Sequence, residues 1–66
     1  MNIILNGKQQ TLEPESTLQD LLETKGYVDK IVAVAVNQNF VPKSNYDAHI
    51  ITDGDTIEIV APMQGG

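Results

Sequence analysis

The chain has 66 residues, a formal net charge of −5 and no cysteine. A chain of this length buries only about 60% of its unfolded surface, so a substrate pocket beside the core is not expected and neither is a self-sufficient enzyme. The lack of cysteine excludes disulfides, thiolate metal sites and a cysteine nucleophile, and it is consistent with the cytoplasm. Four Lys and Arg residues are too few to bind nucleic acid well, and no apolar run is long enough to cross a membrane.

The N-terminal residues are predicted to form a β-hairpin. Two strands, residues 1–5 and 8–12, flank Asn6-Gly7. This dipeptide is favoured in a two-residue type I′ turn because both of its positions take positive φ. If Ile3 and Leu5 face the core, the two-residue period of a strand places Ile4 on the opposite face.

A short amphipathic helix is predicted after the hairpin. Ser16 is a good N-cap, and Gln19, three residues later, completes a capping box. Lys25 suits the end of the helix and Gly26 the position just beyond it. The apolar stripe of this helix consists of leucines at i, i+3 and i+4 spacing: Leu18, Leu21 and Leu22.

Residues 31–36 are the most strand-like segment of the chain, with bulky and small side chains in alternation. We expect the bulky set to lie under the helix and Ala33 and Ala35 to lie on the outer face. After a turn at 37–39, residues 40–41 form a short strand that Pro42 ends. Residues 43–49 form a polar connection with one helical turn. The bulky set is Val32, Val34 and Val36.

The last predicted strand, residues 56–60, follows a turn at Asp53-Gly54-Asp55. Its clean alternation places Ile57 and Ile59 inside the protein. The residues that it places outside are Thr56, Glu58 and Val60.

The folded body offers little catalytic chemistry. His49 is the single histidine, so no metal site or Ser-His-Asp set is expected. Asp53 and Asp55 flank a glycine, which is ordinary turn chemistry rather than an acid–base pair. We therefore predict that the body is not catalytic.

The chain ends in Gly65-Gly66, shortly after the last apolar strand. Pro62 is expected to end that strand and release residues 61–66 as a flexible tail with an extended reach of about 20 Å. The carboxylate of Gly66 is unhindered but a poor electrophile, so chemistry there needs a partner to activate it; the alternative is an inert, frayed end. The residues that lead to this reactive end are Met63, Gln64 and Gly65.

Apolar residues on the outer face of the sheet form the second candidate site. They would lie on the face away from the helix, next to the projecting tail, as a docking surface requires. The acidic balance would steer such a surface towards a basic partner. The predicted docking residues are Ile4, Ala33, Ala35 and Val60.

The order of these motifs resembles the ThiS family, the sulfur carrier proteins of thiamin biosynthesis. The resemblance covers essentially the whole chain, with two departures: Lys43 where arginine is common and Tyr46 where tryptophan is common. It rests on Asn6-Gly7, Thr17-Leu18-x-x-Leu21-Leu22, Val32-Ala33-Val34-Ala35-Val36-Asn37, Val41-Pro42, Asp53-Gly54-Asp55-x-Ile57-Glu58-Ile59-Val60 and Gly65-Gly66.

This resemblance implies an α+β fold of the ubiquitin-like β-grasp type. In this fold a mixed sheet of about four to five strands packs on one helix, within one domain spanning residues 1–66. The first and last strands would be parallel neighbours at the centre of the sheet. The pairing of those strands is implied by the family and not by the periodicity.

The resemblance also implies a mechanism centred on Gly66. A ThiF-type enzyme would use ATP to convert the terminal carboxylate into an acyl adenylate. Sulfur drawn from cysteine by a desulfurase system would displace AMP and leave a thiocarboxylate. The thiazole synthase ThiG would then take this sulfur into the thiazole ring. The chain itself would bind no cofactor.

Three different functions would also fit these sequence features. The small subunit of molybdopterin synthase shares the fold, the Gly-Gly end and the thiocarboxylate chemistry. The short length and the segment Val36-Asn37-x-x-Phe40-Val41-Pro42 favour the thiamin carrier instead. The second function is that of a ubiquitin-like protein modifier attached to lysines, and the third is that of a plain binding module with an inert tail.

Overall fold

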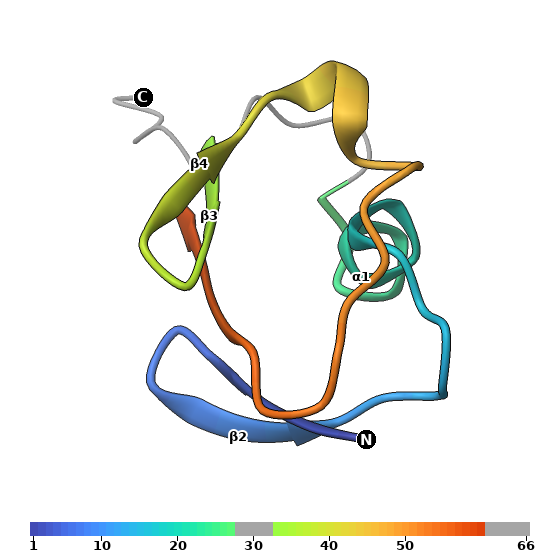
Figure 1. Ribbon diagram of the computed structural model, residues 1–66, viewed down its shortest axis with the longest axis vertical. Coiled ribbons are helices and arrows are strands. Elements are labelled where there is room, and N and C mark those ends of the chain that lie inside the picture. Colours follow the sequence, from blue (N-terminus) through green and yellow to red (C-terminus); the bar gives the residue numbers. More distant parts are fainter. Residues whose placement is uncertain (28–32, 61–66) are drawn as a thin grey trace.

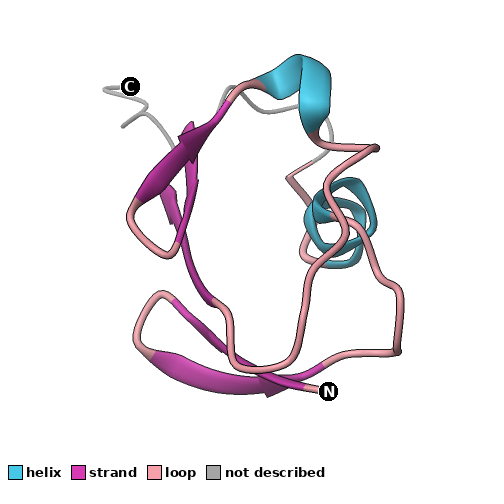
Figure 2. Ribbon diagram, in the orientation of Figure 1, coloured by secondary structure: helices cyan, strands magenta, loops and turns pink. Residues whose placement is uncertain are grey.

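The computed structural model describes residues 1–27 and 33–60 (Figure 1). In this part of the chain the strands form a curved layer, and the helix lies opposite it (Figure 2). The elements are β1 (Asn2–Leu5), β2 (Lys8–Thr11), α1 (Leu18–Thr24), β3 (Ala33–Val36), β4 (Asn39–Val41), the 3₁₀ turn η1 (Lys43–Asn45) and β5 (Thr56–Val60).

The described strands form one mixed sheet with the order β2-β1-β5-β3-β4. The last strand, β5, occupies the centre, parallel to β1 on one side and antiparallel to β3 on the other. Antiparallel hairpins, β1–β2 and β3–β4, complete the two sides. This arrangement confirms the β-grasp fold and the parallel pairing of first and last strands.

Both hairpins turn through two residues of positive φ. Asn6 and Gly7 have φ of 50° and 83°, which confirms the predicted turn between β1 and β2. Asn37 and Gln38 have φ of 51° and 71° at the turn between β3 and β4. Asparagine tolerates this region better than most residues, which explains its place at the first position of both turns.

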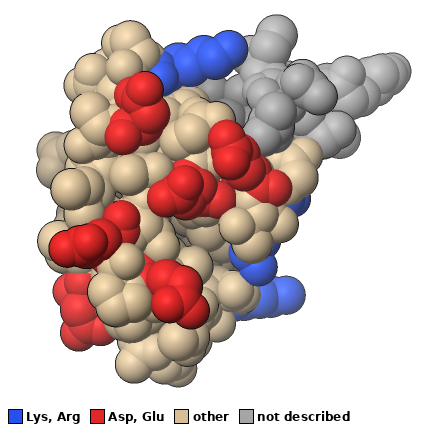
Figure 3. Space-filling view, turned by 90° about the vertical axis from the view of Figure 1, so that its right-hand side faces the viewer, with Lys and Arg blue, Asp and Glu red and all other residues tan. Residues whose placement is uncertain are grey.

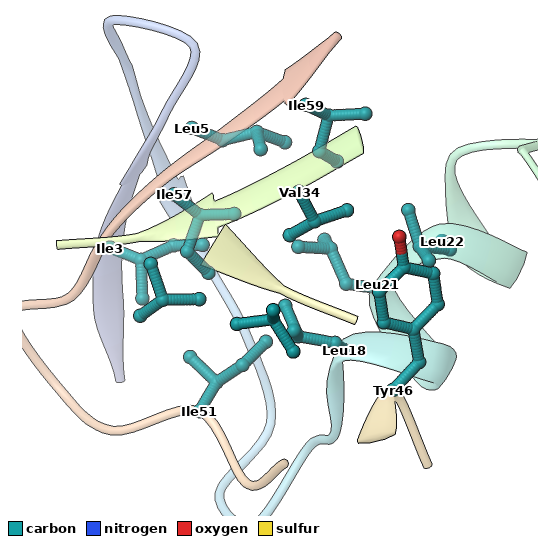
Figure 4. Close-up of a cluster of buried hydrophobic side chains, with 12 residues drawn as sticks. Ile3, Leu5, Leu18, Leu21, Leu22, Val34, Tyr46, Ile51, Ile57 and Ile59 are labelled. Carbon is teal, nitrogen blue, oxygen red and sulfur yellow. The ribbon is translucent and has the colours of Figure 1, made fainter. Parts of the chain in front are cut away.

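The core lies between the inner face of the sheet and α1 (Figure 4). The leucine stripe of the helix and the inward residues of β1 and β5 are buried as predicted. Val34 and Val36 are buried as well, whereas Val32 lies outside the described residues. The buried cluster consists of Ile3, Leu5, Leu18, Leu21, Leu22, Val34, Val36, Val41, Tyr46, Ile51, Ile57 and Ile59.

The connection between β4 and β5 contributes two core residues that the sequence pattern does not reveal. Tyr46 and Ile51 are both buried, although they lie in a mostly polar segment. Backbone hydrogen bonds explain their placement, because this segment caps the start of α1: the N–H groups of Leu18 and Gln19 donate to the carbonyls of His49 and Tyr46, each at 3.0 Å. The connection thus satisfies two of the N–H groups that the start of a helix leaves unpaired.

The predicted helix cap is wrong by one residue. Thr17, with extended φ and ψ, is the N-cap, and Asp20 completes the capping box, in place of Ser16 and Gln19. The Thr17 hydroxyl accepts from the Asp20 N–H at 3.1 Å, and the Asp20 carboxylate accepts from the Thr17 N–H at 3.1 Å. Ser16 instead donates its hydroxyl to the Glu13 carbonyl at 2.8 Å, which closes the preceding turn. The other end is as predicted: Lys25 is the C-cap and Gly26 has φ of 84°.

Candidate functional site

The candidate site begins where β5 ends. Its last residue, Val60, belongs to the central strand, which has hydrogen-bonded neighbours on both sides. The chain continues from there to the predicted reactive end, Gly66. The residues of that end, Met63, Gln64, Gly65 and Gly66, lie outside the described residues.

The register of the sheet brings together three of the four predicted docking residues. Ala33 on β3 lies opposite Val60 on β5, and Ala35 lies opposite Glu58. Side chains in such cross-strand pairs have Cβ atoms about 4.5–5.5 Å apart. Val60 is 64% exposed, as expected for an apolar residue on the outer face. These residues therefore form a continuous strip beside the start of the tail.

Ile4 does not join this strip. It is 38% exposed on the outer face as predicted, but its partner on β5 is Thr56. Val60 lies four positions beyond Thr56 on β5, a distance of about 13 Å along the strand. Ile4 thus marks the opposite end of the outer face.

Phe40 is a candidate docking residue that the sequence interpretation missed. It pairs with Ala35 across the β3–β4 hairpin, and it is 70% exposed. The alternation between Phe40 and the buried Val41 would have placed it on the outer face had β4 been analysed for periodicity. We define the outer patch as Ala33, Ala35, Phe40 and Val60.

Charge is distributed unevenly over the two faces. Glu58 is the single charged residue among the outward positions of the described strands β1, β3, β4 and β5. By contrast, acidic side chains are spread over the face that bears α1, with lysines near its margins (Figure 3). Asp20 and Glu23 of α1 are exposed there. The outer patch and the acidic face that bears α1 are therefore distinct surfaces.

The described residues contain no cluster of potential metal ligands. Their His, Asp and Glu side chains form no group of three or more that could hold a metal ion. Asp53 and Asp55 are turn residues, as predicted: Asp53 Oδ1 accepts from the Asn2 N–H at 2.7 Å, and Asp55 Oδ2 from the Thr52 N–H at 2.9 Å. No helix within the described ranges is long and apolar enough for a membrane span.

Comparison with known proteins decides the family. A model of the ThiS family matches residues 3–66, which includes the Gly-Gly end. The chain belongs to the ThiS family. Over the aligned residues, the relatives described below are between 29% and 38% identical to this chain.

Two relatives illustrate the sequence match. The sulfur carrier protein ThiS of Escherichia coli is 32% identical over 66 residues, which is 100% of both chains. A thiazole synthase of Paramagnetospirillum magneticum is 38% identical over 66 residues. The alignment covers 100% of this chain and 20% of that enzyme, so the chain spans a fifth of its length.

The fold comparison agrees with the sequence comparison. The crystal structure of the thiamine biosynthesis protein ThiS from Geobacter metallireducens superposes with a TM-score of 0.84 at 29% identity. The match covers 100% of both chains. This ThiS protein therefore shares both the fold and the length of this chain.

Proposed function

We propose that this chain is a sulfur carrier of thiamin biosynthesis that carries sulfur on the carboxylate of Gly66. The observation that carries the proposal is the extent of the family match, which runs to the final glycine. A relative of the same length is named a sulfur carrier protein, and a longer one is named a thiazole synthase. The missing cysteine fits this role, because a main-chain thiocarboxylate needs no thiol side chain.

The chemistry begins with activation of the poor electrophile at Gly66. A carboxylate oxygen attacks the α-phosphorus of ATP on a ThiF-type partner, pyrophosphate leaves, and an acyl adenylate forms. A sulfur nucleophile supplied by a desulfurase system then adds to the carbonyl carbon and expels AMP. When this nucleophile is the terminal sulfur of a persulfide, the product is an acyl disulfide. A thiol of the donor system then attacks the other sulfur of that disulfide, which releases the thiocarboxylate and leaves a disulfide on the donor side. The thiazole synthase ThiG is the partner that accepts the sulfur.

The small size of the chain indicates which steps it performs itself and which steps its partners perform. Residues 1–66 act as one domain, in which the folded body docks and residues 61–66 deliver the reactive carboxylate. A body of this size has room for little more than a small core, so we assign the catalytic groups to the partners. The chain is then a co-substrate rather than an enzyme, and a cytoplasmic location suits its dependence on ATP.

The outer patch is the surface on which the partners dock. Val60 and Phe40 are large apolar residues exposed to solvent, and the alanines between them let a partner approach the backbone closely. Exposed apolar residues that are rimmed by polar ones are typical of protein interfaces. Docking here places the start of the tail beside the partner, within about 20 Å of its active site.

Intact-mass spectrometry tests the proposed function. Incubation with the adenylating enzyme, ATP and a sulfur donor should replace one terminal oxygen by sulfur. A chain that lacks Gly66 is the matched control: it should gain no sulfur and unfold at the same temperature, because the described core comprises residues between Ile3 and Ile59. A wild-type chain without the mass gain would refute the proposal. Thiamin-dependent growth of a deletion strain separates this pathway from molybdopterin synthesis.

A further inference from the structure

The side chain of Asn6 pairs with the backbone of β5 one residue before its end. Asn6 Oδ1 accepts from the Ile59 N–H at 2.8 Å, and Asn6 Nδ2 donates to the Ile59 carbonyl at 3.3 Å. These contacts join positions 53 residues apart in the sequence. One carboxamide thus satisfies both backbone groups of Ile59 that face β1.

The hydrogen-bond ladder explains why a side chain is needed there. Along the parallel pair, the Ile4 N–H donates to the Asp55 carbonyl and the Asn6 N–H donates to the Ile57 carbonyl, each at 2.9 Å. The next rung falls at Ile59, but β1 has ended and the chain turns away at Asn6 towards β2. The carboxamide of Asn6 therefore forms the hydrogen bonds to the Ile59 backbone that the backbone of β1 can no longer form.

We propose that Asn6 is a positioning residue for the reaction at Gly66, a role that rests on the proposed function. It holds the end of β5 to the β1–β2 turn, and Val60, which follows Ile59, is the last residue of β5 before the tail. Without the carboxamide, the last residues of β5 keep only the hydrogen bonds to β3. The end of β5 then fluctuates on that side, so the point at which the tail is attached is held less firmly.

The consequence for the reaction is kinetic. Once a partner holds the tail in an extended form, movement at its attachment point is passed on to the reacting carboxylate, and a displacement of about 1 Å can cost on the order of 100-fold in rate. Asn6 is not part of the outer patch, and Val60 of that patch keeps its pairing with Ala33 on β3 when the carboxamide is removed. Loss of Asn6 should therefore slow the chemistry within the complex and leave the affinity for the partner unchanged.

The experiment compares the wild-type chain with Asn6→Gly and Asn6→Asp. Glycine keeps the positive-φ turn and removes both hydrogen bonds. Aspartate keeps the turn and the acceptor for the Ile59 N–H, but it removes the donor to the Ile59 carbonyl. The measurements are the single-turnover rate of adenylation of the carrier by a saturating excess of the ThiF-type enzyme, the dissociation constant of the complex, and hydrogen exchange at the Ile59 amide.

Asn6→Gly should lower the saturating rate on the order of tenfold, with the dissociation constant changed by less than about twofold. Exchange at Ile59 should become faster, and Asn6→Asp should lie between Asn6→Gly and the wild type. Both variants are measured at a temperature at which they are folded; if Asn6→Gly does not fold, Asn6→Asp against the wild type carries the comparison.

Asn37→Gly is the matched control. Asn37 also occupies the first position of a hairpin turn and also pairs with β5, but at its first residue: the Thr56 N–H donates to Asn37 Oδ1 at 3.0 Å. This variant should lose stability without a change in saturating rate. Equal saturating rates for Asn6→Gly and the wild type would overturn the role of Asn6 alone. A wild-type chain that is not adenylated would overturn the proposed function and this role together.

Discussion

The Nδ2 group of Asn37 donates to Oδ1 of Asp55 at 3.0 Å and so joins the β3–β4 turn to the turn before β5. Asp55 is 8% exposed, and its carboxylate also accepts from the Thr52 N–H and the Thr52 hydroxyl at 2.9 and 3.0 Å. Burial is the largest influence on the pKa of Asp55 and raises it. The hydrogen bonds from Thr52 and Asn37 and the nearby His49 act together in the other direction, so the net pKa is lower than that of an ordinary aspartate.

The first prediction concerns the acid stability that Asp55 provides. Because its folded-state pKa is depressed, its contribution is fully present above the unfolded pKa of about 4 and is lost as the pH falls through the lower folded-state value. Asp55→Asn should cost about 1.5–3 kcal/mol at pH 7, since the new amide group is a donor that faces donors. Urea unfolding from pH 7 to pH 2 should show the difference between variant and wild type shrinking below pH 4. A difference that stays constant with pH would show that Asp55 does not act as a carboxylate.

The strand pattern could be predicted from sequence because it is a local property. Alternation alone places Ile57 and Ile59 inside and Val60 outside, and the structure confirms each. The parallel pairing of β1 with β5 was available only from the family resemblance, because no local signal selects the partner of a strand. The fold was thus predicted in two steps, one from periodicity and one from resemblance.

The residues that the sequence did not reveal depend on contacts between distant segments. Tyr46 is buried because the connection that carries it folds over the start of α1, and neither segment signals this alone. The choice between two adjacent hydroxyl residues, Ser16 and Thr17, is decided by the pairing of Thr17 with Ile50, which is remote in the sequence. In the candidate site, the separation of Ile4 from Val60 follows from strand register, which the sequence does not specify.

The helix cap gives the second prediction. Thr17→Ala removes the hydroxyl that accepts from the Asp20 N–H, so it should cost about 0.5–2 kcal/mol of folding stability. A domain of this size then unfolds several degrees lower, since about 1 kcal/mol shifts Tm by about 4–8 °C. Ser16→Ala is the control and should cost less, because Ser16 lies outside the capping box. Calorimetry that ranks the two variants in the reverse order would restore Ser16 as the cap.

The third prediction tests the outer patch. Val60→Asp places a charge at the exposed end of β5, next to Ala33, and should weaken binding to the adenylating enzyme and to thiazole synthase about tenfold or more. Ile4→Asp is the comparison, because Ile4 lies on the same face but opposite Thr56. It should weaken binding less. Titration calorimetry measures both affinities, and thermal unfolding establishes that each variant is folded. Equal affinities for Val60→Asp and the wild type would remove the patch from the proposal.

The last prediction tests whether association with the partner depends on the charge beside the outer patch or on the total charge of the chain. Glu58 is the charged residue beside the outer patch, opposite Ala35, whereas Glu23 is exposed on α1 across the sheet from it. Reversing either residue to lysine changes the formal net charge of −5 by the same amount. If the partner presents a basic group to the outer face, Glu58→Lys should slow association and weaken the salt dependence of the association rate. Glu23→Lys should have a smaller effect, because electrostatic steering depends on the potential at the interface. Stopped-flow association at several salt concentrations measures both rates. Equal slowing by the two variants would show that the partner responds to the total charge of the carrier and not to the face that docks.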